Sequence, residues 1–485
     1  MLTKLNMSES KLVNATRVKN ETTHNGMTTN HTSLNACIDM FFLSGASRQM
    51  NSEDIIKVFL GAYTQNNDVA LRILFWSRDI RGGAGERYFF KTVMNYLSMK
   101  KPYIFNEVIS LVPEYGYWKD LVDLRDTKED AVLELVSTAL LNRNSLCAKW
   151  MPRKGAFANS LRKYMGITPK QYRKLLVELT DVVETKMCNK KWNEISYDKI
   201  PSKAFNKYLK AWNRNDKNRF SEFLNDVNDG KSKINASAIF PHTIVKSIDK
   251  DGAIEQWNSL PDYMKDSDER ILPMCDVSGS MMGLPMDVSI ALGIYISERN
   301  KSIFKDAFLT FSANPTMEYL KGNLRDRVHQ LRVAEWGMNT DLYKAFKLIL
   351  TNAVHMDLDQ DEMPTKLLII SDMEFDESQR DSWGDDLENE WNPTAEEMIR
   401  DLYEKAGYKL PGIIFWNVNG RVGNVPALSD AKNIGLVSGF SPSILTSILE
   451  GGDSFTPESI MKETIYNERY DAVSDIPNHM NYERY

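Results

Sequence analysis

The sequence is poor in the residue types that mark secreted, metal-cluster and membrane proteins. Its 485 residues contain only six histidines and four cysteines, Cys37, Cys147, Cys188 and Cys275. The cysteines form no CxxC pair, which favours reduced, buried thiols over a disulfide framework or a zinc site. No apolar run approaches the ~20 residues that span a bilayer, and the first residues lack the apolar core of a signal peptide. We therefore expect a cytoplasmic protein.

Acidic side chains are missing from one stretch, although the whole chain carries a net charge of −6. Between residues 145 and 176 there is no Asp or Glu, and aromatic residues alternate with cations. Cations interleaved with aromatic rings are what phosphate neutralisation and base stacking require. A solvated helix face with its aromatics in the core is the alternative interpretation. The candidate RNA-binding residues of this stretch are Lys149, Arg153, Lys154, Arg162, Lys163, Lys170, Arg173 and Lys174.

A glycine-rich turn, RDIRGGAGER at residues 78–87, carries further cations. No Lys-Ser or Lys-Thr follows and no strand precedes it, which argues against a nucleotide phosphate loop. Two interpretations stay open: a tight turn between helices, and a turn whose amides and arginines contact an RNA phosphate. The candidate RNA-binding residues here are Arg78, Arg81 and Arg87.

Changes in composition and in the spacing of apolar residues along the chain predict several domains, as its length allows. Residues 1–33 are rich in Asn, Thr and Ser and predict a flexible leader. Residues 34–250 show apolar residues at helical spacing, broken by Pro and Gly, which predicts an all-α HEAT-like domain. After a linker at 251–268, alternating apolar strands and helices over 269–452 predict an α/β, doubly wound, Rossmann-like domain. Residues 453–485 form a polar tail with no predicted element.

Oxygen-bearing side chains follow two apolar strands of this second domain. The first strand ends in DVSGS, which places Asp276, Ser278 and Ser280 at its carboxyl end, where open α/β sheets bind ligands. Hard oxygens at alternating positions suit Mg²⁺, with Mn²⁺ or Ca²⁺ as alternatives, rather than zinc. A strand-to-helix turn capped by serines is the competing interpretation. Thr340 stands before a later helix, and Asp372 ends the strand KLLIISD.

The order DVSGS, then NTD, then ISD resembles a von Willebrand factor A domain with its metal-ion-dependent adhesion site (MIDAS). This resemblance implies metal ligands at Asp276, Ser278, Ser280, Thr340 and Asp372. The strings CDVSGSM, TFSANP and SDMEFD also resemble a Ro-like, TROVE-related family that joins a HEAT-like helical domain to such an A domain. That resemblance implies binding of noncoding or misfolded RNA as a ribonucleoprotein scaffold.

The histidines are too scattered to assemble a nucleophile, a base and an orienting group, so we expect binding and not enzymatic activity. The first hypothesis is a Ro-like RNA-binding protein for single-stranded or structured RNA, whose metal-binding A domain makes partner or intramolecular contacts. The alternative is a metal-dependent protein-interaction or assembly module, for example a viral one, that does not bind RNA. The resemblance to the A domain implies an open metal position for an acidic residue of a protein partner, which a water or an internal group could occupy instead, and no membrane is involved.

Overall fold

The computed structural model describes residues 21–23, 26–124, 129–311, 315–333, 342–375, 395–450 and 455–474. The chain divides into two compact units. The sheet unit comprises Met1–Asp54, Leu60–Ala70 and Asp262–Ile465, and the helical unit comprises Ile55–Phe59, Leu71–Pro261 and Tyr466–Tyr485. The predicted combination of a helical region with a C-terminal α/β region is therefore present. No helix among the described residues is long and apolar enough to cross a bilayer.

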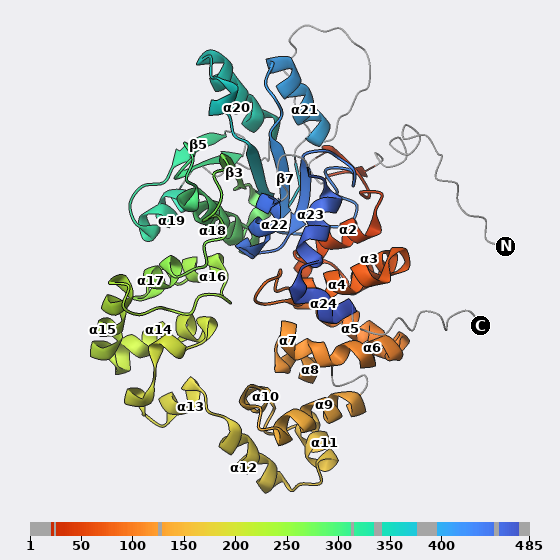
Figure 1. Cartoon of the computed structure of the whole chain (residues 1–485), viewed down its shortest axis with the longest axis vertical. Coiled ribbons are helices and arrows are strands. Elements are labelled where there is room, and N and C mark those ends of the chain that lie inside the picture. The colour runs from red at the N-terminus through yellow and green to blue at the C-terminus, as the bar shows by residue number, and fades with distance from the viewer. Residues whose placement is uncertain are drawn as a thin grey trace, which may run out of the picture. The chain divides into compact units, whose positions relative to one another are not determined.

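Two helices, α3 (Ser52–Gln65) and α4 (Asn67–Arg78), contribute residues to both units. The other helices of the helical unit pack mainly on helices close to them in sequence, such as α10 on α8, α9 and α12 (Figure 1). These helices are α5 (Tyr88–Lys100), α6 (Pro102–Val108), α7 (Val112–Tyr115), α8 (Trp118–Asp123), α9 (Glu129–Leu141), α10 (Ser145–Trp150), α11 (Ala156–Tyr164), α12 (Pro169–Leu179), α13 (Val183–Cys188), α14 (Ser202–Asn215), α15 (Lys217–Asn228), α16 (Pro241–Val245), α17 (Ala253–Asn258) and α24 (Asp471–Ser474). Short 3-10 turns lie at η2 (Ile109–Leu111), η3 (Trp192–Glu194), η4 (Tyr197–Lys199) and η8 (Glu468–Tyr470).

The C-terminal segment of the chain completes the core of the helical unit. Asp79 is fully buried, and it accepts hydrogen bonds from Arg469 Nη2 at 2.7 Å and from the Tyr470 hydroxyl at 3.0 Å. Tyr470 is itself buried and stacks on Tyr115, with ring centroids 5.7 Å apart. The sequence predicts no element after Gly452, whereas α24 and η8 form there, because the partner of this polar, Tyr-rich segment lies almost 400 residues away.

The six-stranded sheet of the sheet unit has the order β5-β4-β3-β6-β7-β8. Neighbouring strands are parallel except for the antiparallel pair β4 and β5. The strands are β3 (Ile271–Asp276), β4 (Ala307–Phe311), β5 (Thr316–Tyr319), β6 (Lys366–Ser371), β7 (Gly412–Asn417) and β8 (Ile434–Ser438). The order in which strands are added reverses between β3 and β6, and this is the point where open α/β sheets bind ligands.

Helices and 3-10 turns flank this sheet (Figure 1). They are α2 (Ala36–Ser44), η1 (Ser47–Gln49), η5 (Gly279–Met281), α18 (Leu284–Arg299), α19 (Leu324–Val333), α20 (Leu342–His355), η6 (Gln360–Glu362), α21 (Ala395–Ala406), η7 (Pro442–Ile444), α22 (Leu445–Glu450) and α23 (Pro457–Ile465). A two-residue ladder joins β1 (Glu21–Thr22) to β2 (Thr28–Thr29).

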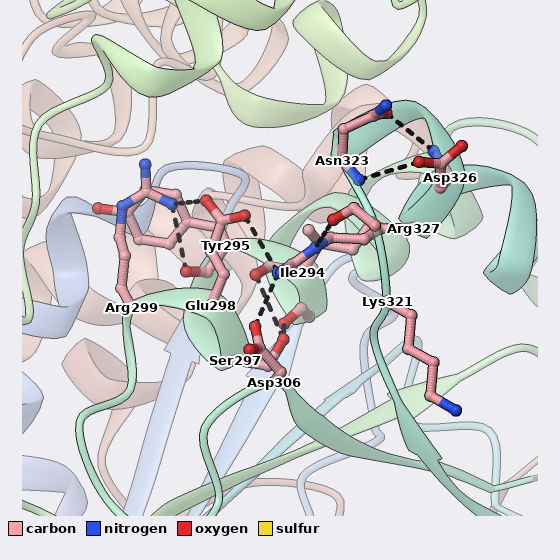
Figure 2. A network of polar contacts seen from close by, with 12 residues as sticks. Ile294, Tyr295, Ser297, Glu298, Arg299, Asp306, Lys321, Asn323, Asp326 and Arg327 are labelled. Atoms are coloured by element: carbon pink, nitrogen blue, oxygen red, sulfur yellow. Dashed lines mark hydrogen bonds and ion pairs between the residues drawn. The ribbon is translucent and has the colours of Figure 1, made fainter.

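Helix α18 follows the candidate metal loop and is buried along most of its length. Gly293 lets it approach β3 closely, because a Cβ atom there would lie 2.3 Å from Cys275 Sγ. Beyond the end of α18, Arg327 of α19 donates to Asp306 Oδ1 at 2.7 Å, and Asp306 N donates to Ser297 O at 2.9 Å (Figure 2). This network ties the C-terminal end of α18 to Asp306 and to α19.

The N-terminal part of the chain belongs to the sheet unit. Helix α2 packs on β8 and on α23. Ser438 Oγ donates to Phe41 O at 2.7 Å and accepts from Gly45 N at 3.0 Å. Upstream, Asn30 and Val425 exchange two backbone hydrogen bonds of 3.0 and 3.1 Å. The sequence boundaries had placed residues 34–54 with the helices, since a buried helix carries no local sign of which unit will cover it.

Candidate divalent-cation site

Two buried carboxylates meet at the reversal point of the sheet. Asp276 is the last residue of β3 and Asp372 follows β6 directly, with 0% and 1% of their surfaces exposed. Asp276 Oδ1 accepts from Ser278 N at 2.9 Å, and its Oδ2 accepts from Ser371 Oγ at 2.6 Å. Asp372 Oδ1 accepts from Glu374 N at 3.3 Å. Its Oδ2 is buried and has no hydrogen-bond partner among the described residues.

Both carboxyl groups are costly to ionise in their buried positions. Burial, and then the negative charge of Asp372, raise the pKa of Asp276 well above its ordinary range. Burial also raises the pKa of Asp372, against the opposing hydrogen bonds of the Glu374 amide and the Ser280 hydroxyl. A bound cation would remove this penalty, because an opposite charge favours the ionised carboxylates.

The serine hydroxyls belong to the same cluster. Ser278 Oγ lies 3.1 Å from Ser280 Oγ, and the Ser280 hydroxyl is close enough to Asp372 to lower its pKa. Ser278 precedes the turn η5, but its hydroxyl makes no capping hydrogen bond. The competing interpretation of a serine cap therefore does not apply to Ser278. Ser278 is buried whereas Ser280 is exposed, which means that the cluster opens to solvent at Ser280.

The donor set fits a hard divalent cation. Among the described residues no three His, Cys, Asp or Glu side chains gather as a cation site. The set is therefore a mixed one, of two carboxylates and two hydroxyls from Asp276, Asp372, Ser278 and Ser280. All-oxygen ligands suit Mg²⁺, Mn²⁺ or Ca²⁺. The fifth predicted ligand, Thr340, lies outside the described residues.

A strained turn after Asp372 was not anticipated from the sequence. Met373 is buried and has a φ of +64°, a left-handed conformation that is uncommon for a residue with a side chain. Asn424 Nδ2 holds this turn by donating to Met373 O at 2.8 Å and to Glu374 Oε1 at 3.2 Å. Thr29 Oγ1 donates in turn to Asn424 Oδ1 at 3.0 Å. The loop that positions Asp372 is thus tied to the N-terminal segment. No short-range pattern could reveal a bond between residues 29 and 424.

The arginines of the glycine-rich turn are engaged within the helical unit. Arg78 is buried and its Nη2 lies 2.6 Å from Asp120 Oδ2. Arg87 Nε lies 2.9 Å from Asp120 Oδ1, and Arg81 Nη1 donates to Glu114 O at 2.7 Å. A Cβ atom at Gly83 would lie 2.0 Å from Trp76 O. The turn therefore has the tight interhelical geometry, and its charges already have partners inside the protein.

The cations of the acid-free stretch are arranged differently. Lys149 forms an ion pair with Glu184 at 3.4 Å, and Arg162 Nε donates to Asn159 at 3.2 Å. The other six are exposed and take part in no ion pair among the described residues. They are Arg153, Lys154, Lys163, Lys170, Arg173 and Lys174.

The interleaved aromatics divide between the two interpretations. Phe157 and Tyr172 are buried in the core, Trp150 is half-buried against Tyr117, and Tyr164 is exposed. Lys170, Arg173 and Lys174 lie at i, i+3 and i+4 of α12, Lys163 lies on α11, and Arg153 and Lys154 precede α11. This stretch is therefore basic and exposed, but it has only part of the aromatic surface that base stacking requires.

The fold and the site define a protein in which a helical unit is combined with a six-stranded α/β unit carrying a candidate cation site. Residues 23–132 and 151–272 match the family described as a domain of unknown function, DUF2828. Residues 270–481 match a second domain of unknown function, DUF7788. The boundary between the two matches falls at the start of β3. The chain is 31% identical to "Uncharacterized protein L728" of Acanthamoeba polyphaga mimivirus over 503 aligned positions, covering 90% of this chain and 86% of that protein. The chain belongs to the family of this mimivirus protein.

These matches correct the resemblance drawn from the short strings. Neither the Ro-like, TROVE-related family nor the von Willebrand factor A family is among them, so that assignment was wrong. The strings CDVSGSM and SDMEFD are oxygen-rich loops after buried parallel strands. Any open sheet with a ligand site at its carboxyl edge favours such residues, whatever its ancestry.

Proposed function

We propose that the sheet unit is a binding module dependent on a divalent cation held by Asp276, Ser278, Ser280 and Asp372. The observation that carries the proposal is Asp372 Oδ2, a buried carboxylate oxygen without a hydrogen-bond partner among the described residues, beside the equally buried Asp276. Buried polar atoms are almost always satisfied, and an orphaned one calls for an explanation such as an ion. The strained turn at Met373 also fits a site that the surrounding structure holds in place.

The geometry of the cluster supports recruitment of a partner. Mg²⁺ prefers six ligands, and two carboxylates with two hydroxyls leave positions for water or for an acidic group of another protein. Ser280 is the exposed member of the cluster and marks the side from which such a group would approach. The groups around the two aspartates are hydroxyls, backbone amides and the ion pair of Glu374 with Arg421 at 3.3 Å, a polar setting that supports a role in binding.

The test is calorimetric titration of the full chain with Mg²⁺, Mn²⁺ and Ca²⁺. We expect saturable binding of at least one cation, and loss of at least tenfold in affinity in Asp276→Asn and in Asp372→Asn. Asp401→Asn, which changes a surface ion pair with Lys405, is the matched control and should bind as the wild type does. Unchanged binding in both site variants would remove the proposal.

We propose, as a second function, that the helical unit binds RNA through the exposed cations of α11, of α12 and of the segment just before α11. The supporting observation is the group of six exposed cations without ion pairs described above. The cations of helix α12 stand on a well-defined helix, because Thr168 and Gln171 form a capping box at its start and Pro169 is its first residue. Charge of this kind binds phosphates without reading sequence.

Salt dependence tests this second function. Affinity of the full chain for a single-stranded RNA should fall with salt by a slope of roughly −0.7 per phosphate contact. Replacing Lys163, Arg173 and Lys174 with Gln should weaken binding of every sequence and flatten the slope by about two. Replacing Lys210, Lys217 and Lys231 with Gln, also exposed but outside this face, is the control. Binding that is indifferent to both salt and the first triple change would leave only the cation-dependent module.

Two finer structural assignments belong with these proposals. The strand order of the sheet supports a doubly wound arrangement, and the packing of helices on their sequence neighbours supports a HEAT-like stack. We also propose a reducing, cytoplasmic setting. All four cysteines are free, and burial raises the pKa of Cys37 to about 11 and of Cys147 to about 12, which keeps these thiols protonated and unreactive.

A further inference from the structure

A second hollow lies at the opposite edge of the sheet from the candidate cation site. It is a cavity of about 190 Å³ at the amino ends of β6 and β7 and before β8. Residues immediately before or at the start of these strands, Lys366, Gly412 and Asn433, contribute to its wall. The cavity therefore has a framework of central strands and does not depend on surface loops alone.

The charge in this cavity is unbalanced. Its lining contains three cations, Arg270, Lys366 and Lys409, and one acid, the exposed Asp361. Glu269 lies behind the lining and accepts from Lys366 Nζ at 2.7 Å. Glu269 and Asp361 together balance two of the three positive charges, and the remaining positive charge favours an anion.

Two of the cations have N–H groups that make no hydrogen bond to the described residues. The Lys366 side chain is only 3% exposed, and its ammonium group makes one described hydrogen bond although it has three N–H groups. Arg270 Nε donates to Met363 O at 2.8 Å, and neither of its Nη groups makes a hydrogen bond to the described residues. A guanidinium with both Nη groups available matches the two oxygens of a carboxylate or a phosphate.

The other wall of the cavity is apolar and closely packed. Phe455 is buried, and its backbone oxygen accepts from Asn433 N at 2.7 Å. Its ring centroid lies 5.9 Å from Lys366 Nζ. Gly412 is required beside this ring, because a Cβ atom there would lie 2.9 Å from Phe455 ring atoms. Leu410 and Pro411 extend the same wall.

We propose that this cavity binds a small organic oxyanion, a carboxylate or phosphate group carried on a compact, flat apolar body. Arg270 and Lys409 bind the anionic group, Lys366 adds charge from the cavity floor, and the Phe455 wall packs against the body of the ligand. The site is separate from the proposed cation site, since it lies at the amino ends of the strands whose carboxyl ends hold Asp276 and Asp372.

The experiment is calorimetric titration of the full chain with four probes: phenyl phosphate, benzoate, inorganic phosphate and benzyl alcohol. We expect saturable binding of phenyl phosphate or benzoate, weaker binding of inorganic phosphate and none of benzyl alcohol. The comparison of the first two probes distinguishes a phosphate from a carboxylate ligand. Absence of saturable binding for all three anions would overturn the proposal.

Variants locate the binding. Arg270→Gln and Lys409→Gln should each lower the affinity for the bound probe by at least tenfold. Lys409 is exposed, so its variant keeps the test valid even if the Arg270 variant folds poorly. Lys405→Gln is the matched control, a nearby surface lysine that does not line the cavity. Equal affinities in Lys409→Gln and Lys405→Gln would also overturn the proposal.

Discussion

At the scale of single residues, the candidate cation site is a set of polar atoms that satisfy one another with one exception. Ser278 N and Ser371 Oγ satisfy both oxygens of Asp276, whereas one oxygen of Asp372 has no partner in the part of the chain that the structure describes. This asymmetry matters because a capped turn alone would need no second buried carboxylate. Placing two acids together in a buried site is costly without a positive charge.

The raised pKa of Asp276 gives a prediction about pH. A carboxyl group whose pKa is higher in the folded protein contributes stability that is fully present below its unfolded pKa and is lost as pH rises through the folded value. The cation requires the ionised form, so it restores stability where the proton is lost. We expect the increase in melting temperature caused by 5 mM Mg²⁺, a concentration of the order that fills a millimolar site, to be larger at pH 8 than at pH 5.

Asp276→Asn provides the comparison, since it cannot ionise. Its melting temperature should respond to Mg²⁺ little at either pH. An equal Mg²⁺ effect at pH 5 and pH 8 in the wild type would contradict the prediction.

The bond between Thr29 and Asn424 gives a second prediction at this scale. Thr29→Val keeps the shape of the side chain but removes the hydrogen bond to the amide that holds the Met373 turn. The bond is worth about 1 kcal/mol, so cation affinity should fall by roughly fivefold if the turn positions Asp372. Thr28→Val is the control, because Thr28 is equally buried and its side chain makes no described hydrogen bond. Equal cation affinities in the two variants would show that the Met373 turn does not depend on the Thr29 hydroxyl.

At the scale of elements, both ends of the chain act as structural parts of the units they join. The sheet unit takes α2 and the segment before it from the N-terminal side, and the helical unit takes η8 and α24 from the C-terminal side. In each case a buried polar group gains its partner this way, as Asp79 does from Arg469 and Tyr470.

Removal of residues 466–485 should therefore destabilise the helical unit. It leaves the buried carboxylate of Asp79 without its two side-chain partners, which costs about 3–5 kcal/mol for a broken buried pair. The measurement is denaturant unfolding of the truncated and full chains. In an Asp79→Asn background the same truncation should cost clearly less, because no charge is left unpaired. Equal losses in the two backgrounds would mean that packing of Tyr470 dominates.

At the scale of the whole molecule, the residues of each unit are not consecutive along the chain. The sheet unit is interrupted by nearly all of the helical unit, so its N-terminal helix must return to a sheet that begins more than 200 residues later. Contacts of such sequence separation form late and depend on both regions being present.

A fragment of residues 262–465 should accordingly be unstable. It lacks α2, whose Ile38, Phe41 and Phe42 are fully buried. Each of these side chains contributes about 1.5–3 kcal/mol by burial, and together they rival the 5–15 kcal/mol that stabilises a typical domain. We expect the fragment to lack a cooperative thermal transition, measured by circular dichroism, and a version with residues 21–50 fused to its C-terminus through a long flexible linker to regain one. A cooperative transition in the unfused fragment would contradict this.

The sequence by itself determined the strands, the helices around them and the two acids of the candidate site. Burial patterns repeat over a few residues, and an acid placed directly after an apolar strand lies at a sheet edge whatever follows, so Asp276 and Asp372 needed no tertiary information. Only the tertiary structure decided that Arg78 and Arg87 are held by Asp120, that Asn424 and Thr29 support the Met373 turn, and that Arg270 and Lys409 share a cavity. These facts depend on pairs of residues from 33 to 395 positions apart. Contacts between such distant residues follow from the topology of the chain, and no local sequence pattern encodes that topology.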